Sequence, residues 1–411
     1  MAPHAPPQKH LAHPFKALQS RDFRFYFAGQ LVSLAGTWMQ QVAMAWLAYR
    51  LTESALILGL LGFAGQVPIL LFGAMSGVWL DRFDRRRLML WTQSLSLLQA
   101  LALALLTWQG LIDAPLLLFM AFLTGCINAL DLPARQSLVV HLVAERSHLP
   151  NAIALQSMMV NATRFAGPAL AGFIIAFAGE AVCFAINALS YLAVLLALLA
   201  IRARPGGDRS KSALHALRDC LAYTFGHPDI RNALLRVAGV SFLVTPYTAL
   251  MPLIAKTLLG GDARTYGLLL GSAGAGSLLA GLYLASRARV DGLQRLVPRA
   301  ALLAGAALAL FALNVRLALA FPILMVLGVA VAIVAAGSNT LLQTWVRDDM
   351  RGRVMATFSM AFLGVAPLGS LAVGSLAQAF GARPVLFACG LLTLMASLAH
   401  ARVSRAGSTK N

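Results

Sequence analysis

The chain has 411 residues, of which 59% are hydrophobic and only 12% are charged, and its formal net charge is +18. Because a soluble protein has about a quarter of its residues charged, this composition excludes a soluble enzyme or binding domain and indicates a membrane protein. The positive charge does not indicate nucleic-acid binding, because Lys and Arg accumulate in the cytoplasmic loops of membrane proteins and no basic patch is interleaved with exposed aromatic residues.

Residues 1–23 are predicted to form a cytoplasmic tail, because this Pro- and His-rich start lacks the apolar core of a signal peptide. Twelve apolar segments follow, and each is long enough to cross a ~30 Å hydrocarbon core as a helix. They lie near residues 24–49, 55–80, 88–109, 115–132, 151–176, 181–201, 233–256, 265–286, 299–315, 317–345, 354–378 and 384–401. The polar residues 202–232 are predicted to be a cytoplasmic linker between two halves. The halves cover 24–201 and 233–401, and residues 402–411 form a second cytoplasmic tail.

The distribution of basic residues orients these spans. With both termini in the cytoplasm, 26 of the 33 Lys and Arg residues fall on the cytoplasmic side and 5 on the other, while Arg164 and Arg236 remain inside spans. Because positive charge concentrates in cytoplasmic loops, this bias predicts an even number of spans with both ends inside.

The two halves carry a similar segment after their fourth span. "PARQSLVVHLVAERSHLPNAIALQSM" begins at Pro133, and "SNTLLQTWVRDDMRGRVMATFSM" begins at Ser338 in the corresponding part of the second half. Two six-helix halves with internal similarity are typical of transporters whose substrate site lies at mid-membrane between the repeats. The sequence shows no Gly-rich phosphate loop, so we expect an ion gradient or a partner to supply the energy.

The loop after the second span carries the most specific motif, "GVWLDRFDRRRL" at residues 77–88. It resembles the signature loop of the major facilitator superfamily at Gly77, Asp81, Arg82, Arg85 and Arg86, with Asp84 in place of the usual second Gly. The stretches "GTWMQQVAMAWLAYRLTESALILGLLGF", "NATRFAGPALAG" and "RGRVMATFSM" are similar to the bacterial effluxer subfamily that includes the enterobactin exporter and macrolide effluxers. The resemblance covers residues 20 to 400 and implies an all-α, twelve-helix major facilitator fold and an efflux function.

The resemblance implies that the signature loop is a cytoplasmic gate that holds the outward-facing state. It also implies that Asp131, at the end of the fourth span, pairs with Arg85. Asp81 is placed to interact with the positive amino-terminal end of the eleventh span. The alternative is that these residues are ordinary cytoplasmic charges. Ala121 stands where many proton-coupled relatives carry an Arg four residues before Gly125. Because no mid-membrane carboxylate or histidine is visible, Asp131 is the only candidate proton carrier.

Arg164 lies well inside the fifth span. A rise of ~1.5 Å per residue places it ~20 Å from the cytoplasmic face, and a buried arginine costs about 2.5–3.5 kcal/mol even on the mildest scale. The nearest candidate partner, Asp131, differs from it in depth by ~14 Å, and no other acidic residue falls at mid-depth. Arg164 is therefore either satisfied by amides, hydroxyls and backbone carbonyls or available to an anionic substrate.

Polar residues recur at helical spacing inside several spans and are predicted to line a substrate cavity. They are Gln30, Ser33, Thr37 and Gln41 on the first span, and Asn128, Asn161, Arg164, Thr245, Tyr247, Asn339 and Gln343 elsewhere. The alternative is hydrogen bonding between helices, which such side chains also provide. Gly167, Pro168 and Gly172, in a segment that resembles a shortened antiporter motif, are predicted to bend the fifth span, since Pro168 removes a helix hydrogen bond.

We therefore expect a monomeric exporter of small amphiphilic molecules, siderophore-like or drug-like, in the bacterial inner membrane. Alternating access in exchange for protons is expected, without a bound cofactor or metal, because the cysteines lack metal-ligand spacing. His4, His10 and His13 could bind metal, but their place in the N-terminal tail favours a plain tail. Arg164 favours an anionic cargo. The alternatives are an importer of the same fold, a membrane-embedded enzyme, for which no catalytic cluster is visible, and a sensor without transport, for which the linker is too short to hold an output domain.

Overall fold

The computed structural model describes residues 16–80, 84–143, 145–201, 226–287 and 290–408, which form helices joined by short turns, with no strand among them. This follows from the composition, because in lipid a helix satisfies all its backbone groups internally. The first half consists of η1 (Lys16–Gln19), α1 (Arg21–Thr52), α2 (Ala55–Leu80), α3 (Arg85–Trp108), α4 (Ala114–Leu142), η2 (Arg146–His148), α5 (Leu149–Ala178) and α6 (Glu180–Ala200).

The second half has the same number of long helical spans, but two of them are divided. It consists of α8 (Pro228–Leu243), α9 (Tyr247–Leu253), η3 (Ile254–Leu258), α10 (Ala263–Ser286), α11 (Leu293–Leu313), α12 (Leu317–Trp345), α13 (Asp348–Ser359), η4 (Met360–Gly364), α14 (Val365–Phe380) and α15 (Ala382–Ser408). The elements η3 and η4 are π-helical turns. Such turns are frequent at functional sites, and here each lies inside one span.

Eleven helical stretches of the described chain are long and apolar enough to cross a membrane. The twelfth span is α1. Its 32 residues are long enough to cross a membrane, but its recurring Gln, Ser and Thr side chains make it less apolar than the other eleven. The predicted architecture of twelve helices in two halves is confirmed. The boundaries agree within a few residues for most spans, but α4 continues through Pro133 to Leu142, well past the predicted end near residue 132.

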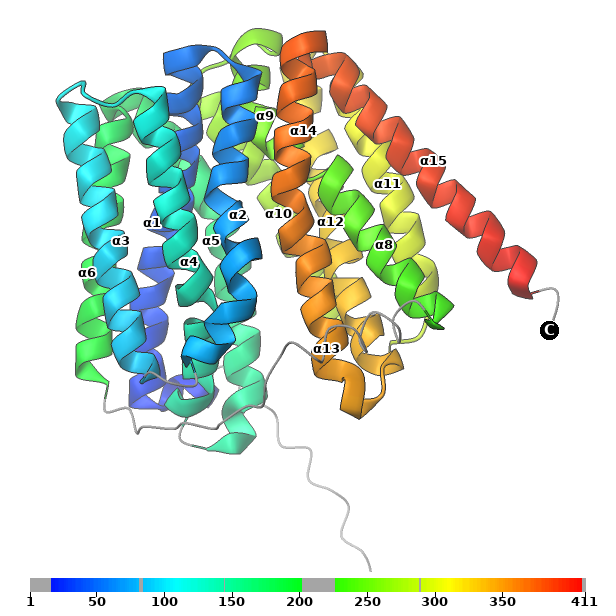
Figure 1. Ribbon diagram of the computed structural model, residues 1–411, viewed down its shortest axis with the longest axis horizontal. Helices are drawn as coiled ribbons and strands as arrows, with labels where there is room; N and C mark the ends of the chain where they lie inside the picture. The colour runs from blue at the N-terminus through cyan, green and yellow to red at the C-terminus, as the bar shows by residue number, and fades with distance from the viewer. Residues whose placement is uncertain (1–15, 81–83, 144, 202–225, 288–289, 409–411) are drawn as a thin grey trace, which may run out of the picture.

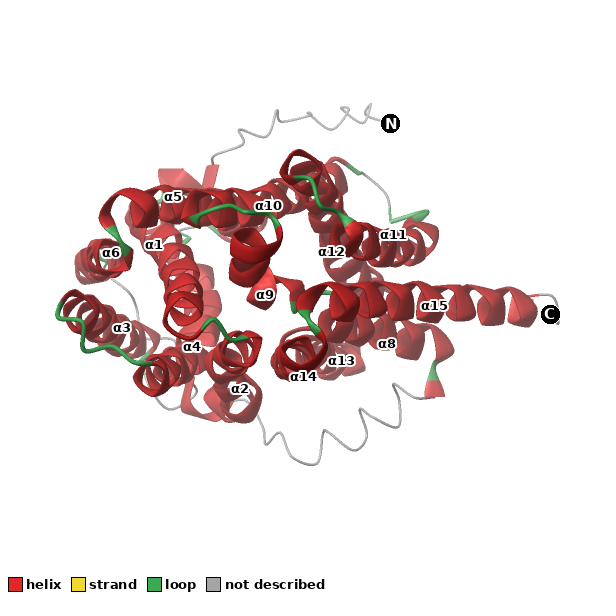
Figure 2. Cartoon of the chain, turned by 90° about the horizontal axis from the view of Figure 1, so that it is seen from above, coloured by secondary structure: helices red, strands yellow, loops and turns green. Residues whose placement is uncertain are grey.

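The two halves lie side by side and meet along two seams, α5 against α10 and α2 against α14 (Figure 2). Glycine makes both approaches possible. A Cβ atom on Gly374 would lie 2.6 Å from the Cα of Gly59, and one on Gly172 would lie 2.6 Å from the Ala263 carbonyl oxygen. All these contacts lie toward the side of the bundle where α1 ends and α2 begins, which we call the α1-end side.

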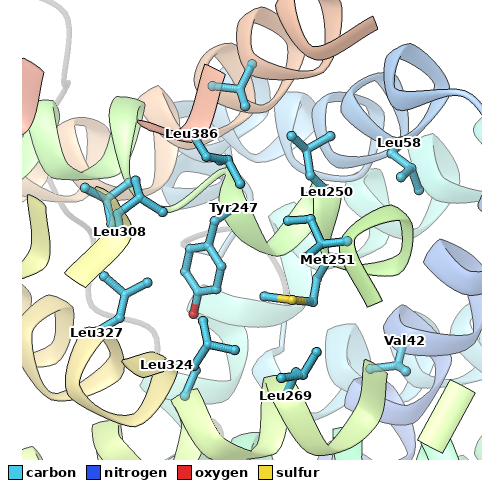
Figure 3. Close-up of a cluster of buried hydrophobic side chains, with 14 of the residues drawn as sticks. Val42, Leu58, Tyr247, Leu250, Met251, Leu269, Leu308, Leu324, Leu327 and Leu386 are labelled. Atoms are coloured by element: carbon cyan, nitrogen blue, oxygen red, sulfur yellow. The ribbon is translucent and has the colours of Figure 1, made fainter. Parts of the chain in front are cut away.

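An apolar plug joins the halves on the same α1-end side. Figure 3 shows Leu250 and Met251 of α9 between Val42 and Leu58 of the first half on one side and Tyr247 on the other, and all five are buried in one cluster. Removing apolar surface from water stabilises a contact by about 25 cal/mol per Å². Where this side of the bundle would otherwise meet water, burial of the apolar plug therefore keeps the two halves together. On the opposite side, the ends of α2 and α13 stand apart (Figures 1 and 2). The halves are therefore closed on the α1-end side.

Asp262 caps the first turn of α10 outside the span. Its Oδ1 accepts hydrogen bonds from the Thr265 backbone N–H at 3.0 Å and from the Thr265 hydroxyl at 3.2 Å. The backbone hydrogen bond from Thr265 is the largest cause that holds the pKa of this carboxyl below its ordinary value of 3.8, and Arg264 adds to it. A carboxylate at this position therefore stabilises the helix only while it is ionised.

Asp262→Ala is expected to destabilise the protein by about 1 kcal/mol at neutral pH, the usual cost of losing an N-cap. Because the folded-state pKa is depressed, this contribution is present above the unfolded-state pKa of 3.8 and is lost as the pH falls through the lower folded-state value. The melting temperatures of wild type and Asp262→Ala in detergent, compared at pH 7 and near pH 3, measure this contribution. A difference in melting temperature that stays constant over this range would contradict the assignment.

Candidate functional site

Arg164 lies at the middle of α5, and its guanidinium Cζ is 5.1 Å from the centroid of the Trp38 ring on α1. At ~1.5 Å per residue, it is ~22 Å along the helix from Leu149. Tyr247 of the other half, on α9 between the two halves in Figure 2, interacts with it electrostatically. Arg164 is surrounded by protein, yet its side chain is exposed, which places it at an internal space between packed elements.

Arg164 has no acidic partner among the described residues. The ion pairs there are Arg50–Glu180 at 3.1 Å, His148–Glu145 at 3.6 Å, Arg264–Asp262 at 3.9 Å, and Arg135–Asp131. The ring of Trp38 supplies a cation–π contact of about 0.5–2 kcal/mol. This is less than the ~2.5–3.5 kcal/mol that placing an arginine at mid-membrane costs. The Trp38 contact alone therefore does not offset this cost.

Two glycines set the positions of these side chains. A Cβ atom on Gly274 of α10 would lie 2.8 Å from the Arg164 carbonyl oxygen, so the backbones of α5 and α10 touch at the level of the arginine. A Cβ atom on Gly167 would lie 2.6 Å from the Cβ of Trp38, so α5 and α1 are equally close there. Close backbone packing of this kind holds Arg164 and Trp38 on a rigid base.

Tyr247 owes its position to the break in the seventh span. α8 ends at Leu243, residues 244–246 form a turn that contains Pro246, and α9 begins with Tyr247. The sequence predicts one continuous segment here, 233–256, because hydropathy does not register a turn of three residues. The turn carries Thr245, whose hydroxyl donates to the Val240 carbonyl at 3.4 Å, closing the end of α8.

Several of the remaining predicted cavity residues form hydrogen bonds within their own helices. Asn161 is about one turn before Arg164 and donates to the Ser157 carbonyl at 2.8 Å within α5. Gln343 donates to Asn339 on α12. Gln41 is exposed and Asn128 is half-buried. Of the predicted set, the structure brings Arg164 and Tyr247 together, and Trp38 completes the group.

The first-span stripe points into the N-terminal half. Gln30 and Ser33 are buried, and the Thr37 hydroxyl lies 3.3 Å from the Tyr191 hydroxyl of α6 and donates to the Ser33 carbonyl. This is the hydrogen bonding between helices that the sequence leaves open as the alternative. Trp38, one residue further along the helix, contacts Arg164 instead.

The pairing of Asp131 with Arg85, predicted for the outward-facing state, is not formed in the described conformation. Asp131 forms an ion pair with Arg135 and accepts hydrogen bonds from Thr92 at 2.8 Å and Gln93 at 2.7 Å. Arg135 lies four residues further along α4, on the same helix face, so it reaches the carboxylate without crossing between helices. Arg85 lies instead against His141, at 2.9 Å from Nε2.

The structure describes some of the other predicted gate residues but not all of them. Arg86 donates to the carbonyl oxygens of Leu198 at 2.7 Å and Leu199 at 3.0 Å, so it caps the carboxyl end of α6. Gly77 lies within α2, and Asp81 and Arg82 lie outside the described residues. The prediction that Gly167, Pro168 and Gly172 bend the fifth span stays a prediction, since α5 continues through Pro168. Both glycines also lie at close helix contacts.

A buried polar network in the N-terminal half was not predicted. Gln40 of α1 donates to Gln99 of α3 at 2.9 Å and accepts from Asn187 of α6 at 2.7 Å. The signal was present in the third span, where Thr92, Gln93, Ser96 and Gln99 follow helical spacing on one face. Arg135, four residues after Asp131, was equally visible.

An apolar groove on the outside of the N-terminal half is separate from this site. It has a volume of about 570 Å³ and lies between α1, α5 and α6, lined among others by Val32, Ala166 and Leu189. Val32 and Leu189 are 51% and 65% exposed, so the groove opens outward rather than toward the other half. It offers no charged group to a cargo.

Residues 12–409 match the family described as transmembrane secretion effector, within the major facilitator superfamily. The chain belongs to this family. The predicted superfamily membership is confirmed, and the protein is a multi-pass membrane transporter rather than an enzyme. It works on a small-molecule substrate across a lipid bilayer.

The curated relatives include transporters of two kinds of cargo. The staphyloferrin A transporter of Staphylococcus aureus is 25% identical over 93% of this chain and 96% of its own length. The multidrug efflux pump Tap of Mycolicibacterium fortuitum is 24% identical over 89% of this chain and 91% of its own. Macrolide efflux protein A of Streptococcus pyogenes is 23% identical over 64% of this chain and 66% of its own.

Solved structures share the fold. A bacterial homologue of the lysosomal transporter Spinster aligns with a TM-score of 0.72 at 15% identity, covering 93% of this chain and 96% of that one. A bacterial homologue of the iron transporter ferroportin aligns with a TM-score of 0.70 at 17% identity, covering 92% of this chain and 98% of that one. At these identities the likeness shows the fold alone.

Proposed function

We propose that this transporter exports small amphiphilic organic anions, siderophore-like or drug-like, from the cytoplasm across the inner membrane in exchange for protons. The observation that carries the proposal is Arg164, a mid-span cation that faces an internal space and has no acidic partner among the described residues. The relatives that carry staphyloferrin A or drugs support efflux of cargo in this size class.

The three residues around the site supply complementary chemistry. The guanidinium of Arg164 presents a planar fork of donors that matches a carboxylate or phosphate. Trp38, which is half-buried, offers a large apolar face with one polar tip, suited to the hydrophobic part of an amphiphile. Tyr247 of the other half is 6% exposed within the closed apolar plug, so a cargo at Arg164 reaches its ring only when that plug opens.

With both termini in the cytoplasm, the α1-end side faces outward. The seams and the apolar plug are then closed on the outer side, so the described conformation receives cargo from the cytoplasm. Export requires these contacts to open while the opposite side closes, and the gate residues Arg85 and Arg86 lie on that opposite side, at the start of α3. Cargo in the site favours whichever state it binds more tightly.

Purified protein in lipid vesicles with an imposed proton gradient tests the proposal. Three matched amphiphiles that differ only in an anionic, neutral or cationic head group are offered from the side of the termini. We expect gradient-driven movement of the anionic compound, faster than the other two by about tenfold, the effect of one charged hydrogen bond. Equal rates for all three head groups would contradict the anion preference, and movement only in the opposite direction would contradict export.

A further inference from the structure

Three buried side chains in the N-terminal half carry polar atoms without a protein partner. They are the hydroxyl of Tyr26, both amide atoms of Gln30, and the amide oxygen of Gln93. Their side chains are 1%, 0% and 1% exposed. Among buried polar groups this is unusual, because the large majority are hydrogen-bonded.

Two of these side chains, those of Gln93 and Tyr26, are placed near Asp131 by their contacts. Gln93 of α3 uses its amide nitrogen to donate to the carboxylate at 2.7 Å, which leaves its oxygen directed elsewhere. Tyr26 of α1 packs in one buried cluster with Met89 of α3 and with Ala134 of α4, which lies three residues after Asp131. Gln30 follows Tyr26 by one helical turn on the same face of α1. We call Tyr26, Gln30, Gln93 and Asp131 the inner polar seam.

The charged and titratable groups around the carboxylate are few. Arg135 of α4 is ion-paired with Asp131, Tyr26 approaches from α1, and Tyr191 of α6 interacts with Arg135. From α3 the neighbours are the uncharged Thr92 and Gln93. Asp131 is therefore the only acid at this place in the described chain, and it is 2% exposed.

Gln30 and Gln40, both on α1, differ in the free-energy cost of burying their amide groups. Each buried polar group left unpaired costs about 1–3 kcal/mol, so the four atoms of the seam together represent several kcal/mol. Gln40 on the same helix avoids this cost, because both its amide atoms bond to protein. A leucine at position 30 would be more stable in a dry site. Buried water, which takes two to four polar partners, is the occupant that satisfies such atoms.

We propose that the inner polar seam is hydrated and carries the coupling proton to and from Asp131, within the N-terminal half and apart from the cargo site at Arg164. This rests on the proton exchange of the proposed function. In the described conformation Asp131 is ion-paired with Arg135, as expected after its proton has left toward the cytoplasm. When a proton arrives through the seam, it neutralises the carboxylate and releases Arg135, which couples protonation to the packing of α4 against α1 and α3.

Gln30→Leu and Gln40→Leu form a matched pair for transport assays in vesicles. Gln30→Leu is expected to lower proton-driven cargo transport by about tenfold through loss of the water-bound amide, while cargo-for-cargo exchange without a gradient stays near wild type. Gln40→Leu is expected to lower the melting temperature but to retain proton-driven transport per folded molecule. A Gln30→Leu variant that is more stable and drives transport like wild type would show that the seam is dry and structural.

Water in the seam is measured independently of transport by X-ray radiolysis of the reconstituted protein, which labels side chains next to bound water. Tyr26 is compared with Tyr266, which is also buried but stacks on Trp46 with ring centroids 5.8 Å apart in the apolar cluster. We expect Tyr26 to be labelled several-fold faster, and Gln30→Leu to slow it. Equal slow labelling of both tyrosines would overturn the proposal.

The two proposals fail in different ways. If no cargo moves with any gradient, the proposed function is wrong, whatever the labelling of Tyr26 shows about the seam. If cargo moves with the proton gradient but Asp131→Asn and Gln30→Leu leave it unchanged, the transporter is proton-coupled by another route and the seam assignment is overturned.

Discussion

Replacing Arg164 with alanine is expected to lower transport of an anionic cargo by about 10- to 100-fold, because a hydrogen bond to a charged group contributes ~1.5–3 kcal/mol. Arg164→Lys keeps the charge but loses the planar fork of donors, so we expect an intermediate rate. Transport of a neutral amphiphile should change little, because Trp38 remains to bind its apolar part. Initial rates in vesicles at several cargo concentrations separate weaker binding from slower turnover.

Arg264→Ala is the matched control for this substitution. Arg264 also lies over an aromatic ring, with its Cζ 4.2 Å from the centroid of Phe177, but it sits at the start of α10 on the α1-end side. Its loss removes the same kind of cation–π contact without removing a mid-span charge. If both variants slow the anionic cargo equally, the effect comes from packing or net charge, and the anion site at Arg164 is refuted.

Gly267→Leu is expected to block closure of the α1-end side and to lower transport more than tenfold. A Cβ atom at this position would overlap the Pro168 carbonyl oxygen and lie 2.8 Å from the Cα of Gly172. Overpacking costs typically 1–3 kcal/mol, and because the contact exists only when the seam is closed, the cost falls on that one state. Spin labels at Leu51 in the first half and Ala379 in the second, both exposed, report the distance between the halves on the α1-end side.

Gly239→Leu provides the control, because a Cβ atom on this α8 glycine would meet nothing within 4 Å. We expect it to transport normally and to keep the label separation of wild type. For Gly267→Leu, the two labels should move further apart while the helical content stays unchanged. A Gly267→Leu variant with wild-type transport and unchanged label separation would show that the seam does not need the glycine.

The sequence alone predicted most of the fold, because its physical signals are local. Apolar length gives each span, and internal repetition together with the motif at residues 77–88 gives the family. The depth of Arg164 also follows from counting residues along a helix of known rise. Even the absence of an acid at mid-depth is visible in the sequence, since it depends on composition rather than packing.

The tertiary structure decided which neighbour each polar face meets. Helical periodicity shows that Gln30, Ser33 and Thr37 share a face, but not that this face points toward α6 and the interior of one half. The break before Tyr247 was hidden, because a short turn hardly changes the hydropathy of a span.

The partner of Asp131 also shows what the sequence can predict and what only the tertiary structure decides. The family resemblance favoured Arg85, whereas in the folded chain Arg135 is one helical turn away and reaches the carboxylate first. Spacing along one helix is fixed by its geometry, so Arg135 could have been found from the sequence. Contacts between helices depend on how their side chains interlock, and therefore only the structure revealed that buried atoms of Tyr26, Gln30 and Gln93 are unpaired.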